Sequence, residues 1–309
     1  MIEEQKKCNL CPRMCNADRI NNMGFCRMPW DIYAARASLH MWEEPCISGN
    51  NGSGAVFFTG CTLRCVFCQN NEIASGRAGK KITTDRLAEI FLELQQQKAN
   101  NINLVTPTHY AGQIIRAVEK AKSNGLTIPI VYNTSCYERV ETLKRLEGIV
   151  DIYLPDMKYY DSTYAAKYSN APDYFEMSAK ALEEMVRQTK GAVFADSGQA
   201  ARLGIEEGMM MGGVIVRHLL LPGLKKDSKR IIKYLYQKYG NDIYISIMNQ
   251  YTPLKHVNNI GELNRRVTDK EYNEVVDYAI DLGVVNGFIQ EGGTAEESFI
   301  PQFDFSGIN

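Results

Sequence analysis

Three cysteines stand close together in the spacing C-x3-C-x2-C: Cys61, Cys65 and Cys68. They follow directly on the short apolar run 55–58, which is bounded by glycines and predicts a buried strand. A loop this tight can place three thiolates on three corners of a 4Fe–4S cube, because cysteine thiolates hold such clusters. The fourth iron then lacks a protein ligand, and an open metal site can bind and activate a small molecule. A zinc site and buried thiols are the alternatives, but structural zinc usually has four ligands.

Four further cysteines lie upstream in the spacing C-x2-C-x3-C-x10-C: Cys8, Cys11, Cys15 and Cys26. Four thiolates can saturate one metal centre, and zinc, a 2Fe–2S cluster and a 4Fe–4S cluster are all chemically acceptable there. This segment has too few periodic apolar residues for a core of its own, so a bound metal would supply folding free energy. Cys46 remains open as a structural residue, a spare ligand or a redox thiol.

Composition excludes several classes of protein. The chain has 309 residues, 45% of them hydrophobic and 23% charged, with a net charge of −1. These values are ordinary for a globular protein and argue against bulk electrostatic binding to nucleic acid or a membrane surface. No apolar run approaches the roughly 18 residues of a membrane span, and the first residues lack the apolar stretch of a secretion signal. We expect a cytoplasmic protein, where clustered cysteines indicate metal or redox chemistry more often than disulfides.

Strands and helices are expected to alternate from about residue 54 onwards, after a loop-like segment 1–50. Expected strands are 55–58, 102–105, 128–132, 149–154, 214–221 and 243–248. One expected helix begins at about 84, and a second is marked by apolar residues over 114–121 and ends near 125. Further helices are expected over 138–146, 173–189, 227–239 and 269–282. Such alternation builds right-handed βαβ units with parallel strands, which close into a barrel or a doubly wound sheet. Reactive groups in these folds sit at the carboxyl ends of the strands.

The first cysteine motif, with the aromatic Phe67 before its last cysteine, resembles the signature of the radical S-adenosylmethionine (SAM) superfamily. Further segments resemble its pyruvate formate-lyase activating enzyme-like branch, including the PflX-type iron–sulfur proteins. These segments are CNLCPR from residue 8, EPCISG from 44, CQN from 68, VTPTHY from 105, LPDMK from 154 and LPG from 221. The resemblance implies an α/β fold with a partial (β/α)6 barrel of parallel strands. It divides the chain into a cysteine-rich metal-binding extension (1–50), the barrel (51–290) and a C-terminal tail (291–309).

The resemblance also implies a chemistry. In that superfamily the amino and carboxylate groups of SAM chelate the open iron of a 4Fe–4S cluster. An electron from the cluster cleaves SAM to methionine and a 5′-deoxyadenosyl radical, which abstracts a hydrogen atom from the substrate. The protein mainly binds and orients the cofactor.

Candidate cofactor contacts follow from the same resemblance. Where relatives have a Gly-Gly-Glu-like turn for the SAM amino group, this chain has Thr106-Pro107-Thr108-His109. Thr106 and Thr108 are therefore candidates, and His109 either contacts SAM, faces the substrate as a catalytic residue or is a loop histidine. The remaining candidate SAM contacts are Phe67, Asn70, Asn133, Ser135, Asp156, Lys158 and Gln250. Arg217 and His218 lie within one expected strand, so alternation points only one of them inward, and Arg217 is the second catalytic candidate.

The leading functional prediction is a radical SAM enzyme. A non-catalytic iron–sulfur electron carrier usually saturates its cluster with four cysteines, and a zinc-binding module is supported by the upstream cysteines alone. The resemblance implies a reductant such as flavodoxin or ferredoxin as partner, and a glycyl radical enzyme or another protein as a possible substrate. The chain shows no glycyl radical motif of its own, so the radical would act on another molecule.

Overall fold

The computed structural model describes residues 5–290 and 301–309. Within these residues the strands form a single sheet in the order β10-β9-β8-β6-β5-β4-β2-β1-β3, with β7 paired to β8. The strands are β1 (Ile32–His40), β2 (Ser53–Phe58), β3 (Lys80–Ile82), β4 (Ile102–Val105), β5 (Ile130–Thr134), β6 (Ile152–Pro155), β7 (Val193–Phe194), β8 (Met210–Leu219), β9 (Tyr244–Met248) and β10 (Gly287–Ile289). The helices are α2 (Pro45–Ser48), α3 (Asn71–Ala74), α4 (Thr84–Gln96), α5 (Ala111–Ser123), α6 (Val140–Lys144), α7 (Ser162–Ser169), α8 (Tyr174–Thr189), α9 (Ser197–Leu203), α10 (Lys225–Tyr239) and α11 (Asp269–Leu282).

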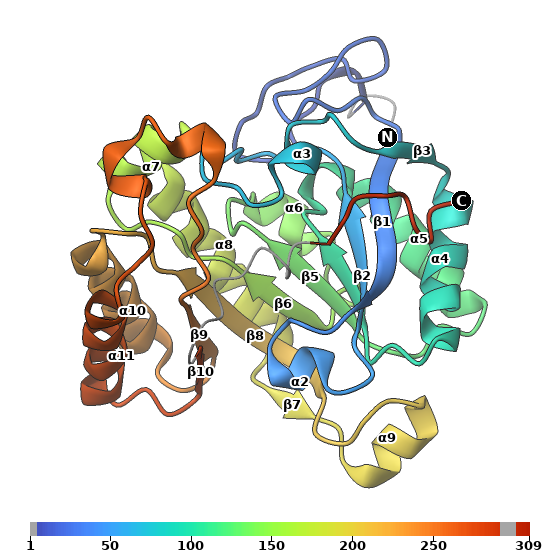
Figure 1. The fold of residues 1–309 in the computed structure, drawn as a ribbon. Helices are drawn as coiled ribbons and strands as arrows, with labels where there is room; N and C mark the ends of the chain where they lie inside the picture. The colour runs from blue at the N-terminus through green and yellow to red at the C-terminus, as the bar shows by residue number, and fades with distance from the viewer. Residues whose placement is uncertain (1–4, 291–300) are drawn as a thin grey trace.

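The neighbouring strands β2, β4, β5, β6, β8, β9 and β10 are all parallel. The sheet curves, with helices such as α4, α5, α8 and α10 along its outer side (Figure 1). The predicted partial barrel of six parallel strands is therefore confirmed, and β10 adds a seventh that was not among the expected strands. Two helix predictions, 173–189 and 269–282, agree with α8 and α11 to within one residue. No helix among the described residues is long and apolar enough to cross a membrane.

The prediction that residues 1–50 are loop-like is wrong for β1. This strand pairs antiparallel with both β2 and β3, so it belongs to the same sheet as the barrel. Its small residues Ala34, Ala35 and Ala37 hide the alternation of large apolar and polar side chains that would indicate a strand. The described end of the tail also packs on β1, because the Phe305 amide donates to the Ala35 carbonyl at 3.0 Å.

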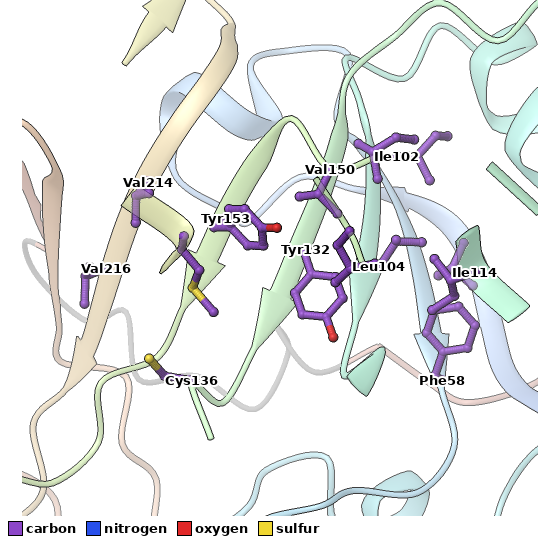
Figure 2. Packing of buried hydrophobic residues seen from close by; sticks show 14 of the residues in the cluster. Phe58, Ile102, Leu104, Ile114, Tyr132, Cys136, Val150, Tyr153, Val214 and Val216 are labelled. Atoms are coloured by element: carbon purple, nitrogen blue, oxygen red, sulfur yellow. The ribbon is translucent and has the colours of Figure 1, made fainter. Parts of the chain in front are cut away.

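The main core lies between the sheet and its outer helices. Leu104, Tyr132, Tyr153 and Val214 are aligned across the parallel strands and buried on this outer face (Figure 2). Residues that alternate with them point to the opposite, concave face of the sheet. The register thus leaves the inner face free to carry the side chains of a site.

One carboxyl group is buried at the edge of this core. Glu138 is fully buried, and its Oε1 accepts hydrogen bonds from the hydroxyls of Thr108, at 2.6 Å, and Thr134. Its Oε2 has no hydrogen-bond partner. Burial raises the pKa of Glu138 to about 7, against the hydrogen bonds from the two threonines.

Replacing Glu138 with Gln should stabilise the protein above neutral pH. The unfolded carboxyl ionises near pH 4.5 and the folded one near 7, so the folded state loses stability as the pH rises through this window. The amide keeps an oxygen for both threonines and never ionises. The gain over the parent should grow between pH 5 and pH 8 towards about 3 kcal/mol, at 1.36 kcal/mol per pKa unit. Thermal unfolding of both proteins in the same metal-loaded form measures it, and a pH-independent difference would contradict the prediction.

Candidate functional site

The three predicted cluster cysteines lie in one loop, between β2 and α3. The loop begins at Gly60, which has a φ of +90°. A Cβ there would lie 2.2 Å from the Met28 side chain and 2.8 Å from the Cys26 carbonyl oxygen, so only glycine fits. The loop then wraps around its first thiol, because the amides of Leu63 and Arg64 both lie 3.4 Å from Cys61 Sγ.

The end of α7 supports the second cysteine of the loop. The Ser169 hydroxyl donates to Cys65 Sγ at 3.0 Å, and the Tyr159 hydroxyl lies 2.8 Å from the same serine oxygen. The Val66 amide donates to the Tyr168 carbonyl at 2.8 Å. These contacts fix the cysteine side chain to a neighbouring helix.

The N-terminal extension holds the same loop from the other side through Arg13. Its guanidinium donates to the carbonyl oxygens of Thr62 at 2.9 Å, Leu63 at 3.3 Å, Ser169 at 2.8 Å and Asn170. One cation therefore satisfies four carbonyl groups of the cysteine loop and the α7 end together, and the extension is part of the site's support.

The loop opens onto a cavity of about 480 Å³ on the concave face of the sheet. A cavity of this size is typical of cofactor and substrate sites. Most predicted site residues line it: Cys61, Cys65, Cys68, Phe67, Asn70, Thr106, Asn133, Ser135, Asp156, Lys158, Arg217 and Gln250. The strand ends thus converge on one site as the parallel arrangement predicts.

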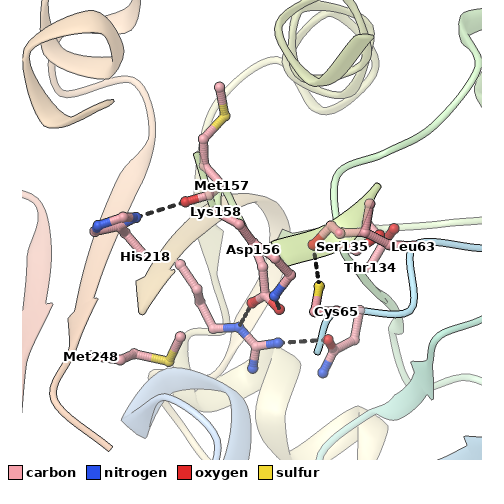
Figure 3. Close-up of polar contacts among 12 residues, drawn as sticks. Leu63, Cys65, Thr134, Ser135, Asp156, Met157, Lys158, His218 and Met248 are labelled. Atoms are coloured by element: carbon pink, nitrogen blue, oxygen red, sulfur yellow. Dashed lines mark hydrogen bonds and ion pairs between the residues drawn. The ribbon is translucent and has the colours of Figure 1, made fainter. Parts of the chain in front are cut away.

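A network of partly buried charges runs along this cavity (Figure 3). Arg217 Nε and Lys158 Nζ donate to the two oxygens of Asp156 at 2.8 and 2.9 Å. The other Arg217 nitrogens donate to Glu43 Oε2 at 2.8 Å and Asn133 Oδ1 at 2.6 Å. Burial would raise the pKa of Asp156, but the two cations outweigh it and lower that pKa below its usual range. Arg217 is therefore already paired with two carboxylates and an amide.

Lys158 also acts on the thiols. Burial, reinforced by the neighbouring thiols, raises the pKa of Cys68 to about 12, and burial likewise raises the pKa of Cys65. The Lys158 ammonium opposes both shifts. Metal coordination deprotonates a thiol outright, so a cation bound at the loop would remove the cost of ionising these cysteines.

Two of the predicted SAM-binding and catalytic residues lie outside the cavity. Thr108 donates its hydroxyl to Glu138 instead. His109 is buried with its Nε2 2.7 Å from the Thr59 carbonyl oxygen, and burial lowers its pKa to about 3. The turn after β4 is a 3-10 helix, Thr108–Tyr110, which rotates both side chains towards the core. The predicted roles in SAM binding and catalysis therefore do not match these positions.

Thr106 does line the cavity, in an unusual backbone conformation. Its φ is +60°, a region that β-branched residues rarely adopt. Such strain, of order 1–3 kcal/mol, concentrates at functional sites.

The two polar residues of β8 point in opposite directions, as the alternation of a strand predicts. Arg217 faces the cavity, whereas His218 points away, with its Nδ1 2.7 Å from the Met157 carbonyl oxygen.

Several cavity residues were not predicted. Glu43 and Glu44 precede α2, His40 ends β1, and Ser246 lies within β9. The sequence feature that could have indicated them was the pair of adjacent acids before Pro45, of which the resemblance included only Glu44. These two acids are brought to the other strand ends by β1, a strand that the sequence did not reveal.

The upstream cysteines gather in the extension. Cys8, Cys11 and Cys26 are buried and Cys15 is exposed. A Cβ built at Gly24 would lie 3.3 Å from Cys26 Sγ and 3.6 Å from Cys15 Sγ, so these two sulfurs flank the same glycine. The fully buried Arg19 lies 3.8 Å from Cys8 Sγ and donates to the His109 carbonyl at 2.7 Å, tying the extension to the barrel.

Among the described residues, no group of three or more His, Cys, Asp or Glu side chains is arranged to hold one metal ion. A cubane cluster makes a different demand, because its cysteine ligands bind separate irons and need not converge on one point. The donor set of the loop, with three thiols, a serine hydroxyl on one sulfur and a cavity beyond, suits such a cluster.

Comparison with known proteins finds similarity over this region. Residues 55–195 match the model of the radical SAM superfamily. The chain is 26% identical over 284 residues to an uncharacterised protein of Methanocaldococcus jannaschii, covering 89% of this chain and 74% of that protein.

A radical SAM methyltransferase from Sphaerobacter thermophilus has a similar fold, with a TM-score of 0.50 and 12% identity over 94% of this chain and 86% of the other. SuiB from Streptococcus suis, solved with SAM, gives a TM-score of 0.47 and 13% identity over 75% of this chain. This chain covers only 48% of SuiB, about half its length. The radical SAM match implies a 4Fe–4S cluster and SAM.

Replacing Ser169 with Ala should lower the reduction potential of the reconstituted cluster. The serine hydroxyl donates to Cys65 Sγ, and such a bond favours the more negative, reduced cluster. We expect a fall of a few tens of millivolts, since about 59 mV corresponds to about 1.4 kcal/mol for one electron. Ser169→Thr, which retains a hydroxyl, is the control. Redox titration followed by electron paramagnetic resonance gives the potential, and equal values in parent and Ser169→Ala would contradict this role.

Proposed function

We propose that this chain, which contains a radical SAM superfamily domain, is an enzyme that cleaves SAM reductively and abstracts hydrogen from a substrate in the described cavity. The observation that supports this most directly is the cavity itself, where three cysteines of the signature motif meet polar residues from several strand ends. An electron carrier would need no internal space of about 480 Å³ beside its cluster.

Cys61, Cys65 and Cys68 would hold the cluster in this proposal. When bound, the cluster supplies the electron that breaks a carbon–sulfur bond of SAM. The chain's own residues position the cofactor: Lys158, close to the Cys65 and Cys68 thiols, offers a cation to the SAM carboxylate. The cavity also offers the Thr106 and Ser135 hydroxyls and the Asn70 and Gln250 amides for the remaining polar groups. Packing of Phe67 against Tyr159, Tyr168 and Tyr251 keeps the motif rigid and shields it from water.

Finer assignments rest on the sequence resemblance. We propose a place in the activating enzyme-like, PflX-type branch, with a small electron-transfer protein such as flavodoxin or ferredoxin as reductant. A glycyl radical enzyme remains a candidate substrate, provided that the cavity admits one of its loops. An alternative is a small molecule held inside the cavity.

A second metal centre is proposed at Cys8, Cys11, Cys15 and Cys26. Three of these thiols are buried in a segment that lies against the barrel. Burial raises the pKa of Cys26, and neighbouring thiols raise it further while Arg19 opposes them. A metal would stabilise the thiolates: an iron–sulfur cluster suits thiols that do not converge on one point, whereas a single zinc ion would require these four to move closer together.

The central test replaces Cys65 with Ala. Each cysteine of the motif is one of three ligands, so the variant should assemble no SAM-cleaving cluster after anaerobic reconstitution. Iron and sulfide content and the formation of 5′-deoxyadenosine under a strong reductant are measured in variant and parent. Cys136→Ala, at a buried cysteine outside the cavity, is the matched control. SAM cleavage by Cys65→Ala, or a brown parent that never cleaves SAM, would count against the proposal.

Replacing Cys8 and Cys11 together tests the second centre. The double variant should lose metal and thermal stability while the cluster at Cys61–Cys68 still assembles, because the two sets share no cysteine. Elemental analysis distinguishes zinc from iron. Unchanged metal content and melting temperature would exclude a metal at this site.

A further inference from the structure

The charge network ends beside a carboxyl group with an unsatisfied oxygen. Glu44 stands immediately before α2, lines the cavity and is 7% exposed. Its Oε2 has no hydrogen-bond partner, and it caps no helix amide with its side chain. Ser246 hydrogen-bonds the carboxyl group and lowers its pKa, although burial dominates and raises that pKa overall. A buried carboxylate oxygen without a partner is costly, so its presence beside a cavity points to a ligand.

The other two carboxylates of the cavity already have hydrogen-bond donors, so Glu44 is the one available to a ligand. Glu43 accepts from Arg217 at 2.8 Å and from the Asn103 amide at 2.9 Å. Asp156 is occupied by Arg217 and Lys158. Both oxygens of each of these acids therefore already have donors from the protein.

The charges do not balance either. Among the cavity-lining residues that the structure describes, the acids are Glu43, Glu44 and Asp156, and the bases are Lys158, Arg217 and His40, whose pKa is lowered by burial. With the three acids, Lys158 and Arg217 ionised and His40 neutral, three negative charges face two positive ones. An excess of one negative charge favours cationic ligands, and the sulfonium of SAM is itself one, so the unpartnered oxygen of Glu44 is the feature that distinguishes the α2 side of the cavity.

We propose that the α2 side of the cavity binds a cationic nitrogen group of the substrate, a primary ammonium or a guanidinium, with the Glu44 carboxylate as its partner. Such a donor would pair with the Glu44 carboxylate, which lines the cavity and whose buried Oε2 lacks a partner, through a charge-assisted hydrogen bond. The cavity joins this point to the cysteine loop, so the other end of the substrate lies towards the site of hydrogen abstraction. The inference rests on the proposed function for that last step, but the cation site itself is testable as binding.

The test uses the reconstituted holoenzyme under anaerobic conditions. The probes are agmatine, which carries an ammonium and a guanidinium on a four-carbon chain, and neutral 1,4-butanediol. Ligand-observed NMR titration gives both affinities, without SAM and with saturating SAM. The parent should prefer agmatine, and Glu44→Gln should bind it about ten- to hundredfold more weakly. Glu44→Asp, which keeps the charge, should retain part of the preference and serves if Glu44→Gln does not fold.

Glu138→Gln is the matched control, because it removes a buried carboxyl with one unpartnered oxygen that lies outside the cavity. It should bind agmatine like the parent. Equal agmatine affinity in parent and Glu44→Gln, no preference in the parent, or a preference that saturating SAM removes would overturn the inference. SAM cleavage by the parent is measured separately. A parent that cleaves SAM without the preference overturns only the cation site, and one that shows the preference without cleavage overturns only the proposed function.

Discussion

Three thiols in one short, half-buried loop are the constraint on which the rest of the site depends. Burial opposes the ionisation of Cys65 and Cys68, so the surrounding protein must supply both rigidity and positive charge. Rigidity comes from two directions, because Arg13 of the extension and Ser169 of α7 contact the same loop. Positive charge comes from Lys158, whose own position is set by Asp156. The extension, the loop and the end of β6 therefore form a single mechanical unit.

The charge network extends this unit across the cavity. Arg217 joins Asp156, directly after β6, to Glu43 beside α2, so parts of the chain far apart in sequence share one guanidinium. Removing one partner of such a buried set leaves the others uncompensated, which costs more than the pair contributes. Because its nitrogens already donate to Asp156, Glu43 and Asn133, Arg217 has little capacity left to bind a ligand. Its position in the cavity agrees with the prediction, but its contacts favour an organising role over a catalytic one.

Much of this arrangement could be predicted from the sequence, and the exceptions have physical causes. Strong apolar runs predicted the parallel strands. Because reactive groups in such folds sit at the carboxyl ends of the strands, Asn133, Asp156 and Lys158 could then be placed around one cavity. Thr108 and His109 were misplaced because a single 3-10 turn decides which way they face, and no periodicity reveals such a turn. β1 was missed because alanines carry a weak hydrophobic signal. Glu43 and Glu44 depended on β1, since only its pairing with β2 brings them to the sheet.

The two outermost strands, β3 and β10, are each only three residues long. A long open sheet normally presents unpaired amides and carbonyls along its margins, which can recruit a strand from another molecule. Margins this short offer little template for such recruitment, and Lys80 and Lys81 place charge on one of them. The barrel can thus remain open, as a chemistry inside it requires, without inviting the intermolecular pairing that leads to aggregates.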